Sequence, residues 1–416
     1  MNVLVVGSGG REHAIVHKMK QDGIKKIYCA PGNAGIEELA ACVPIKSDDV
    51  RGLVDFALEK KIYLTIVGPE LSLQAGIVDA FTERGLTVFG PTRQAAMLET
   101  SKSFAKKLLK KYGIPTPQFE VFDASADAID YAGTISYPAV IKADGIAAGK
   151  GVIIAEDSSQ AMAAIKGIMD NRVFGDAGKV VLIEEFLEGA ESSYFVLSNE
   201  RGFLPLGSAR DYKRLRDHDD GPNTGGMGSI SPSDKLTPEL EEKVVKKIVY
   251  PLMEALEKEG IVYRGVLYAG LMIVDDEPYV LEFNARFGDP ETQVLLPRVE
   301  GEMVGILTDS AKGRMFSERL SLKQDVSVCV VMASKGYPAS PQTNNVIEGL
   351  KDAVGKDIFI FHAGTRNEKG IIKTAGGRVL GVTALGESMK AAREKAYRAI
   401  GSIVFEGSQF RSDIGL

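Results

Sequence analysis

Residues 282–293 read Glu-Phe-Asn-Ala-Arg-Phe-Gly-Asp-Pro-Glu-Thr-Gln and follow a β-favouring run that begins at Glu277. Side chains alternate between the two faces of a strand, so we expect Glu282, Asn284 and Arg286 on one face. The other face is expected to carry the apolar side chains Tyr279, Leu281, Phe283 and Phe287. Mg²⁺ prefers oxygen ligands and usually takes only one or two from protein side chains. The segment therefore predicts a magnesium site at Glu282 and Asn284, and the alternative is an edge strand with a solvated polar face.

The composition is that of a soluble multidomain protein. The chain has 416 residues with 44% hydrophobic content, which suffices for the cores of about three domains. Its 50 Lys and Arg against 56 Asp and Glu, in short runs, disfavour a nucleic-acid binder. Three scattered cysteines show no metal-ligand or disulfide spacing, and no apolar run reaches membrane-spanning length. We therefore expect a cytoplasmic protein that binds neither nucleic acid nor membranes.

Alternating strand and helix patterns divide the chain into three α/β parts. From residue 1 to 100, short β-rich runs separated by amphipathic stretches predict a doubly wound domain. Residues 101–325 are expected to form a second domain, which starts with a helix from about Arg93 to Tyr112. The helix-breaking segment Gly113–Pro117 introduces a small lid subdomain at about 118–188. A C-terminal α/β domain is predicted at 326–416.

A glycine-rich turn at residues 7–10 lies between the first strand and the first helix, where backbone N–H groups can receive an anion. It departs from the dinucleotide fingerprint because Glu12 stands at the sixth position of G-x-G-x-x-G. The second strand also ends without an acidic residue for a ribose. A nucleotide-binding oxidoreductase is therefore disfavoured. The turn is interpreted either as a phosphate contact or as tight packing.

A second glycine-rich segment, residues 142–151, joins two β-rich runs. It predicts a hairpin flap, because a P-loop would continue into a helix. Nucleotide phosphates are expected to contact Lys142, Gly145, Gly149, Lys150 and Gly151. The alternative is a mobile surface hairpin.

The acidic segment after the next strand is a candidate for the nucleotide base and sugar. We expect an adenine edge and a ribose to meet backbone groups at Glu185, Phe186 and Leu187 and the carboxylates of Glu184 and Glu191. The alternative is a solvated acidic loop.

Lys102, Lys142, the flap, the acidic segment and the Glu282–Asn284 pair occur in an order that resembles the ATP-grasp superfamily. The resemblance narrows to the phosphoribosylamine–glycine ligase family and spans the chain, with similar motifs at residues 7–14, 30–35, 142–151, 221–228 and 281–293. It implies an ATP-grasp fold that uses ATP with Mg²⁺ or Mn²⁺. The alternatives are another ATP-grasp ligase or carboxylase of purine metabolism, or a non-catalytic nucleotide sensor.

The resemblance also implies a reaction. ATP would phosphorylate the carboxylate of glycine, and the amine of 5-phosphoribosylamine would attack the glycyl phosphate to give glycinamide ribonucleotide. Such phosphoryl transfer needs charge neutralisation and positioning more than proton transfer. The partners would be these small molecules, and we expect the chain to act as a monomer.

The family resemblance assigns roles to individual residues. Lys102 would bind nucleotide, and catalytic roles fall to Lys142, Asp211, Lys213 and Arg286. Further substrate contacts are expected from Arg214, Asn223, Thr224, Gly225, Gly226 and Met227. Glycine's ammonium group is assigned to Asp289 and Glu291, and the sugar phosphate to Gly9 and Asn33. Two departures from the family pattern are Arg210 in place of glutamine and Ser229-Ile230 in place of Ala-Tyr.

Overall fold

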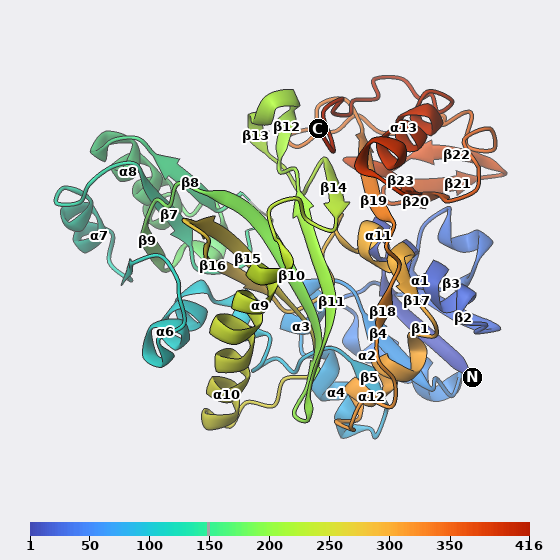
Figure 1. Ribbon diagram of the computed structural model, residues 1–416, viewed down its shortest axis with the longest axis horizontal. Helices are drawn as coiled ribbons and strands as arrows, with labels where there is room; N and C mark the ends of the chain where they lie inside the picture. The colour runs from blue at the N-terminus through green and yellow to red at the C-terminus, as the bar shows by residue number, and fades with distance from the viewer. Residues whose placement is uncertain (148–149) are drawn as a thin grey trace.

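The structure is a computed structural model that describes residues 1–147 and 150–416. Its larger sheets have five, four and eight strands, and three two-stranded ribbons accompany them within the described residues. Figure 1 shows the four-stranded sheet and its helices projecting at one end, while the first and last parts of the chain lie together at the other.

The N-terminal unit is a five-stranded parallel sheet with the order β3-β2-β1-β4-β5. The strands are β1 Asn2–Gly7, β2 Lys26–Pro31, β3 Ala41–Cys42, β4 Leu64–Val67 and β5 Val88–Phe89. The helices are α1 Gly10–Gln21, α2 Val50–Glu59, α3 Glu70–Gln74 and α4 Ile77–Glu83. Helices cover both faces of such a sheet, which is why β1 is a continuous apolar run that is 0% exposed from Val3 to Val6.

The helix predicted from Arg93 to Tyr112 is two helices, α5 Met97–Thr100 and α6 Lys102–Tyr112. Ser101 separates them in an extended conformation, and its hydroxyl accepts a hydrogen bond from the N–H of Phe104. A serine N-cap satisfies a free N–H of the new helix. The break places Lys102 at the first position of α6, which points it at the cleft.

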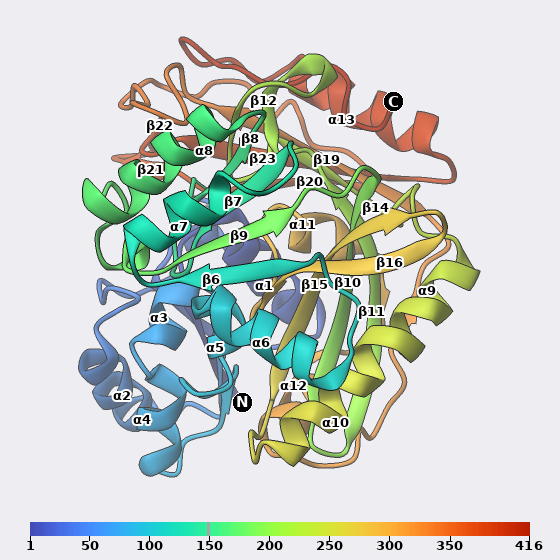
Figure 2. The ribbon, with the colours of Figure 1, turned by 90° about the vertical axis from the view of Figure 1, so that its left-hand side faces the viewer.

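The lid is an antiparallel four-stranded sheet with the order β6-β9-β7-β8 and its own small core. Its elements are β6 Phe119–Phe122, α7 Ser125–Ala132, β7 Ala139–Ala143, β8 Val152–Ala155, α8 Ser158–Ile165 and β9 Val181–Glu185. Figure 2 shows α6 beneath β6, close to the hairpin of the central sheet.

The central sheet has eight strands in the order β16-β15-β10-β11-β14-β19-β23-β20. Its strands are β10 Ala190–Asn199, β11 Gly202–Asp211, β14 Gly228–Ser231, β15 Gly265–Val274, β16 Glu277–Asn284, β19 Val326–Ala333, β20 Ile358–His362 and β23 Arg378–Gly386. Because β14 pairs with both β11 and β19, the sheet runs from the predicted second domain into the C-terminal one.

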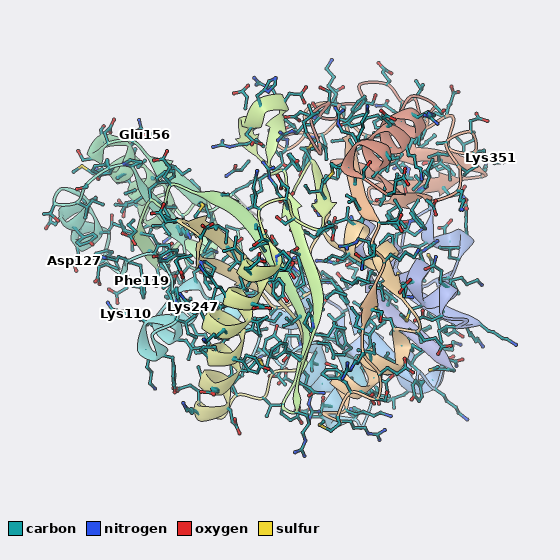
Figure 3. The ribbon with its side chains drawn as sticks, viewed as in Figure 1. Lys110, Phe119, Asp127, Glu156, Lys247 and Lys351 are labelled. Carbon is teal, nitrogen blue, oxygen red and sulfur yellow. The ribbon has the colours of Figure 1, made fainter. Side chains whose placement is uncertain are left out.

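Helices and ribbons cover this sheet. The helices are α9 Pro238–Val244, α10 Tyr250–Lys258, α11 Thr292–Leu295, α12 Val304–Ala311 and α13 Met389–Ile400. The ribbons pair β12 Arg214–Arg216 with β13 Asp220–Asn223, β17 Val299–Glu300 with β18 Ser321–Leu322, and β21 Thr365–Glu368 with β22 Ile371–Thr374. In Figure 3, Asp127 and Glu156 mark the lid and Lys351 marks the C-terminal unit at the opposite end.

No helix within the described ranges has both the length and the apolar character that a membrane crossing requires.

Candidate active site

The β15–β16 hairpin places the predicted metal ligands at a polar hollow. Gly270 on β15 pairs with Glu282 on β16, but the next residue, Leu271, pairs with Val280. Leu281 is therefore the extra residue of a β-bulge. Because of the bulge, Leu281 and Glu282 both line the same hollow.

The bulge overturns part of the predicted alternation. Tyr279 and Leu281 were expected to share the apolar face with Phe283, but they are only half-buried. The buried positions are Pro278, Val280 and Phe283, so the parity changes at Leu281. A bulge inserts one residue without a mark in the hydrophobic pattern, and alternation alone therefore fails here.

Four strands of the central sheet, β10, β11, β15 and β16, surround the hollow. It is lined by Glu191, Ser192, Ser193, Asp211, Lys213, Tyr268, Gly270, Leu271, Leu281 and Glu282. Carboxylates, hydroxyls and a lysine make it a site for a small charged ligand.

Glu282 is the electrostatic centre of the cleft. Burial raises the pKa of Glu282, but Lys213, Lys102 and Lys142 outweigh burial and hold that pKa below its ordinary value. The carboxylate is therefore ionised and faces cations from three different elements. It is available to hold a further cation between the lysines.

The metal-ligand prediction fits Mg²⁺ in one respect. Asn284 Oδ1 lies beside Glu282 on the strand and accepts a hydrogen bond from Arg286 Nη2 at 3.2 Å. Within residues 1–147 and 150–416, no group of three or more His, Cys, Asp or Glu side chains is placed to hold a metal. One carboxylate and one amide oxygen suit an ion that takes its remaining ligands from phosphates and water.

Lys102 ties the start of α6 to the flap. Its backbone N–H donates to the Asp144 carbonyl at 3.0 Å, and its Nζ donates to the Gly145 carbonyl at 3.3 Å. Burial lowers the pKa of Lys102, and Glu282 opposes that effect. The amine of Lys102 thus contacts the flap and lies near the Glu282 carboxylate, which is the predicted metal ligand.

Glu184 lies at the centre of a buried ion network. Lys142 Nζ and Lys106 Nζ donate to Glu184 Oε2 at 2.8 Å and 3.0 Å. The other oxygen, Oε1, is buried and has no hydrogen-bond partner within the described ranges. Glu184 directly precedes residues 185–187, the predicted adenine edge. Its Oε1 is available for a donor such as an exocyclic amino group.

The acidic segment after β9 is open along much of its length. Glu185 is the last residue of the inner strand β9, and its carboxylate accepts from the N–H of Gln118 at 2.8 Å. Phe186 is 37% exposed and Leu187 is half-buried. Glu191 forms an ion pair with Lys213 at 2.7 Å. An exposed strand end with an apolar ring suits the edge and face of a purine.

The flap joins β7 to β8. Gly145 N–H donates to the Ala177 carbonyl at 3.3 Å, and a Cβ on Gly145 would lie 2.9 Å from the Ala177 Cα. Gly151 closes the hairpin by accepting from the N–H of Ala143 at 2.9 Å, and Lys150 is exposed. The predicted phosphate contact at Gly149 lies outside the described residues.

Arg286 connects the central sheet to the N-terminal unit. Its guanidinium lies 3.2 Å from Glu70 Oε2 and 3.0 Å from Glu99 Oε1. Glu99 also accepts from the N–H of Ala285 at 2.8 Å. These carboxylates keep the pKa of Arg286 above its ordinary value in spite of burial. Arg286 is thus a cation held beside Asn284, one of the two predicted metal ligands.

Asp211 ends β11 and faces the hollow. Its Oδ1 is buried and has no hydrogen-bond partner in the part of the chain that the structure describes. A Cβ on Gly226 would lie 2.5 Å from that oxygen, so glycine leaves the space it occupies. Burial and the Glu291 carboxylate raise the pKa of Asp211 well above its usual range. A substrate amino group can supply the donor that this carboxyl lacks.

The two carboxylates predicted to hold glycine's ammonium group lie behind the hollow. Glu291 is 3% exposed and accepts from the hydroxyl of Tyr268 at 2.7 Å. Asp289 Oδ1 accepts from Gln293 Nε2 at 2.7 Å, and Arg378 lies beside its other oxygen. Neither of the two carboxylates lines the hollow.

The two predicted sugar-phosphate contacts are already occupied. The Gly9 N–H donates to Glu12 Oε2 at 2.6 Å, so a carboxylate from α1 fills the anion position of the turn. Asn33 Nδ2 donates to the carbonyls of Ser8 and His362 at 2.8 Å, and its Oδ1 accepts from two backbone N–H groups at 3.0 Å. In this structure the Gly9 N–H and all four hydrogen-bonding positions of Asn33 are used within the chain, and their contacts with a sugar phosphate stay predictions.

The loop at residues 221–228 is held from within. Thr224 Oγ1 donates to the Lys213 carbonyl at 2.8 Å, and Arg214 Nη1 donates to the Gly221 carbonyl at 2.8 Å. Met227 is fully buried, and Asn223 pairs with Arg214 in the β12–β13 ribbon. The structure thus holds these predicted substrate residues together in one loop, which meets the hollow-lining Asp211 at Gly226.

Sequence reasoning missed several residues of the site. Lys106 carried a usable signal, since it lies one turn after Lys102 on the same face of α6. The other missed residues come from distant segments of the chain, and no sequence pattern linked them to the site. They are Glu70, Glu99, Tyr268, Tyr337 and Arg378.

Three family profiles match nearly the whole chain. They are the N domain of phosphoribosylglycinamide synthetase at residues 1–99, its ATP-grasp (A) domain at residues 100–292 and its C domain at residues 327–416. The chain belongs to the phosphoribosylglycinamide synthetase family. The ATP-grasp fold and the predicted family resemblance are thereby confirmed.

Curated members of the phosphoribosylglycinamide synthetase family align along the full chain. A phosphoribosylamine–glycine ligase from Caldanaerobacter subterraneus is 51% identical over 100% of this chain and 99% of its own length. The Pseudomonas aeruginosa enzyme of the same name is 46% identical over 100% of this chain and 97% of its own length.

Solved structures with the same fold include a member of the phosphoribosylglycinamide synthetase family. A crystal structure of phosphoribosylamine–glycine ligase from Thermotoga maritima has a TM-score of 0.87 at 36% identity, covering 99% of this chain and 100% of that chain. A biotin carboxylase domain from Hydrogenobacter thermophilus has a TM-score of 0.75 at 18% identity, covering 98% of this chain and 91% of that one. The second match shows the shared fold alone.

Proposed function

We propose that this cleft ligates glycine to 5-phosphoribosylamine at the expense of ATP, giving glycinamide ribonucleotide, ADP and phosphate in purine biosynthesis. Its relatives bear the name phosphoribosylamine–glycine ligase. One observation carries the proposal: the ionised Glu282 lies among Lys213, Lys102 and Lys142, at the junction of the flap and the hollow. A nucleotide phosphate and a small acid can meet there.

ATP is proposed to lie between the lid and the central sheet. Its phosphates would contact Lys102 and Lys142 beneath the flap, and its adenine would lie along the open edge at residues 185–187. Support comes from the exposed Phe186 ring and from the buried Oε1 of Glu184, which has no hydrogen-bond partner among the residues that the structure describes.

Glu282 and Asn284 are the residues that would hold Mg²⁺ or Mn²⁺. When bound, the ion would neutralise phosphate charge and keep the γ-phosphoryl group in line. Arg286 orients Asn284 through the bond to its Oδ1. We infer a monomer that acts in the cytoplasm, where phosphorylated substrates are kept.

The first step forms an acyl phosphate. A carboxylate oxygen of glycine attacks the γ-phosphorus, the bond from that phosphorus to the β–γ bridging oxygen breaks, and ADP leaves. Lys102 and Lys142 stabilise the transferred charge electrostatically. Asp211 is proposed to accept a hydrogen bond from the glycine ammonium group, since it lines the hollow and its Oδ1 has no partner within the described residues.

The second step forms the amide. The nitrogen of 5-phosphoribosylamine attacks the acyl carbon, the bond from that carbon to the phosphate oxygen breaks, and phosphate leaves while the nitrogen loses a proton. The flap is proposed to cover the acyl phosphate, because water would otherwise hydrolyse it. Lys213 and the loop at residues 221–228 bound the side from which the amine arrives.

The test measures ADP release with Mg²⁺ and ATP, with glycine and phosphoribosylamine supplied separately and together. We expect sustained release and incorporation of labelled glycine only when both are present. Glu282→Ala should reduce turnover by at least about a hundredfold, because metal and phosphate positioning are lost.

Glu277→Ala is the matched control, since Glu277 lies on the same strand and pairs with Lys243 and Lys247 outside the cleft. It should keep wild-type turnover. ATP turnover that does not depend on glycine would refute the proposal. It would indicate the activity of another ATP-grasp ligase or carboxylase.

A further inference from the structure

The C-terminal unit contacts the loop at residues 221–228, called the acceptor wall below, at the peptide of Gly225. The N–H of Gly225 donates to the hydroxyl of Tyr337 at 2.9 Å, and the Gly225 carbonyl accepts from Arg378 Nη1. Tyr337 follows β19, and Arg378 begins β23. Side chains from the C-terminal unit therefore hold both backbone polar groups of Gly225.

Arg378 extends this clamp to a second segment. Its Nη1 also donates to the Asp289 carbonyl at 2.8 Å, and its Nη2 lies 3.4 Å from Asp289 Oδ2. One guanidinium thus links the acceptor wall to the segment that follows the metal-ligand strand. The planar fork of donors makes this possible, and a lysine cannot reproduce it.

The backbone beside Arg378 fixes the orientation of Tyr337. A Cβ on Gly377 would lie 2.3 Å from Tyr337 Cδ2, so the ring packs directly on a glycine backbone. The phenol hydroxyl is thereby held at the Gly225 N–H.

Gly225 precedes Gly226, whose backbone packs tightly against Asp211 and Pro290. Gly226 has a φ of +104°, and a Cβ there would lie 2.5 Å from Asp211 Oδ1 and 2.5 Å from Pro290 Cδ. A shift of the Gly225 peptide would move Gly226 against Asp211. The clamp therefore controls the space around the carboxyl group that lacks a donor.

Arg378 also interacts electrostatically with the carboxyl groups around Asp211. Burial opposes its charge, but Asp289, Asp211 and Glu291 outweigh burial and keep the pKa of Arg378 above its ordinary value. Asp211 in turn has Arg378 among the cations that oppose its protonation. Arg378 is a cation from the C-terminal unit among three carboxyl groups of the cleft.

We propose that Arg378 and Tyr337 are positioning residues for the sugar-phosphate amine, because they hold Gly225 so that the acceptor wall keeps its shape beside Asp211. The inference rests on the proposed function and deepens it, since it assigns the last wall of the acceptor pocket to the C-terminal unit. The nucleotide half of the cleft does not depend on this clamp.

The test uses the full chain and the stable product, glycinamide ribonucleotide, as the probe of the acceptor pocket. Calorimetry measures its dissociation constant in the presence of ADP and, separately, the dissociation constant of ADP. Arg378→Met should weaken product binding by about tenfold or more and leave ADP binding within about twofold, because a charge-assisted bond to the wall is lost. Arg378→Lys should recover only part of the loss.

Tyr337→Phe is the second variant, and it removes one hydroxyl without changing the packed ring. It should weaken product binding by about threefold to tenfold, as expected for one lost neutral hydrogen bond. The matched controls are Arg393→Met and Tyr397→Phe, since these side chains bond to backbone groups of the same unit outside the cleft. They should leave product binding unchanged.

The outcomes separate this inference from the proposed function. Wild-type protein that binds the product, with Arg378 and Tyr337 variants that bind it equally well, would overturn the inference alone. Equal weakening of product and ADP in the variants and in the controls would also overturn it, because the role would then be general stability. A wild-type chain that does not bind the product would refute the proposed function and this inference together.

Discussion

At the residue scale, the sequence predicted those side chains whose chemistry is visible in their type and order. Lys102 and Lys142 lie close enough to Glu282 to lower its pKa, while the roles of these residues in metal and nucleotide binding stay predictions. Asn33 shows the limit of this reasoning. Its residue type suits a phosphate contact, but its four hydrogen bonds are used in holding the N-terminal unit to its neighbours.

Gly226 provides a test at this scale. Gly226→Ala should lower turnover by about a hundredfold, because the new Cβ would overlap Asp211 Oδ1 and displace it from the hollow. Steady-state assays measure this change, and thermal unfolding measures the accompanying strain.

Gly221→Ala is the control for the strain alone. Gly221 also has a positive φ of +84°, but its nearest neighbour would be 3.5 Å from an added Cβ. Both variants should lose about 1 kcal/mol or more of stability because of the positive φ, and Gly226→Ala should lose the larger amount because its Cβ also overlaps Asp211 and Pro290. Equal turnover in the two would show that the space at Asp211 is unimportant.

Lys106 gives a second prediction. Its Nζ contacts Glu184, the Thr116 hydroxyl at 2.7 Å and the Val280 carbonyl at 3.4 Å, and burial lowers the pKa of Lys106 to about 8. Lys106→Met would leave Glu184 with one cation in a buried site. We expect the KM for ATP to rise by about tenfold, since breaking a buried ion pair is costly.

Lys107→Met is the neighbouring control, because Lys107 lies exposed on the same helix. Its KM for ATP should match that of the wild type. An unchanged KM for ATP in Lys106→Met would show that the ion network around Glu184 plays no part in nucleotide binding.

At the element scale, periodicity predicted most strands and helices, including β4 at Leu64–Val67, because their cores are regular. Two irregular features were missed. The bulge at Leu281 adds a residue to an apolar run and leaves no pattern, whereas the break before α6 had a signal in the N-cap residue Ser101. Both features set the direction in which site residues point. Local irregularities of this kind are therefore the main reason that the site could not be predicted in full from the sequence.

The contact between α1 and β20 predicts a dependence on pH. His362 N–H donates to His13 Nδ1 at 2.8 Å, and both rings are buried. Burial lowers the pKa of His362 from 6.5 to about 4, a difference equivalent to roughly 3 kcal/mol. Above pH 6.5 both states are neutral and this stability is fully present. As the pH falls from 6.5 towards 4, the unfolded chain binds the proton first and stability is lost.

Thermal unfolding between pH 4 and 7 measures this effect. His362→Gln should flatten the decline, because the buried imidazole no longer titrates, while the exposed His218→Gln serves as control and should keep the wild-type slope. An unchanged slope in the His362 variant would place the acid sensitivity elsewhere.

At the scale of the whole molecule, the sequence predicted three α/β parts but missed the sheet that unites two of them. The pairing of β14 with β19 joins residues about a hundred positions apart, and neither strand's own sequence identifies its partner. For the same reason the contribution of the C-terminal unit to the cleft, through Arg378 and Tyr337, was out of reach. Long-range pairing decides which segments share a site.

Ligand binding should stabilise the whole molecule in a metal-dependent way. ATP at a hundred times its Kd should add about 2.7 kcal/mol to the free energy of unfolding when Mg²⁺ is present. Chelation of the metal should remove most of this gain, and Glu282→Ala should show little difference between the two conditions. A chelator-insensitive shift in the wild type would argue against Glu282 as a metal ligand.

The most direct measurement follows an oxygen atom. Glycine carrying ¹⁸O in its carboxylate is converted in the presence of ATP, Mg²⁺ and phosphoribosylamine, and the released phosphate is analysed by mass spectrometry. A glycyl phosphate intermediate requires one carboxylate oxygen to leave with each phosphate, so we predict one ¹⁸O per phosphate formed. Phosphate that carries no glycine oxygen, and that takes its label from ¹⁸O-water instead, would contradict the ligation proposed for this cleft.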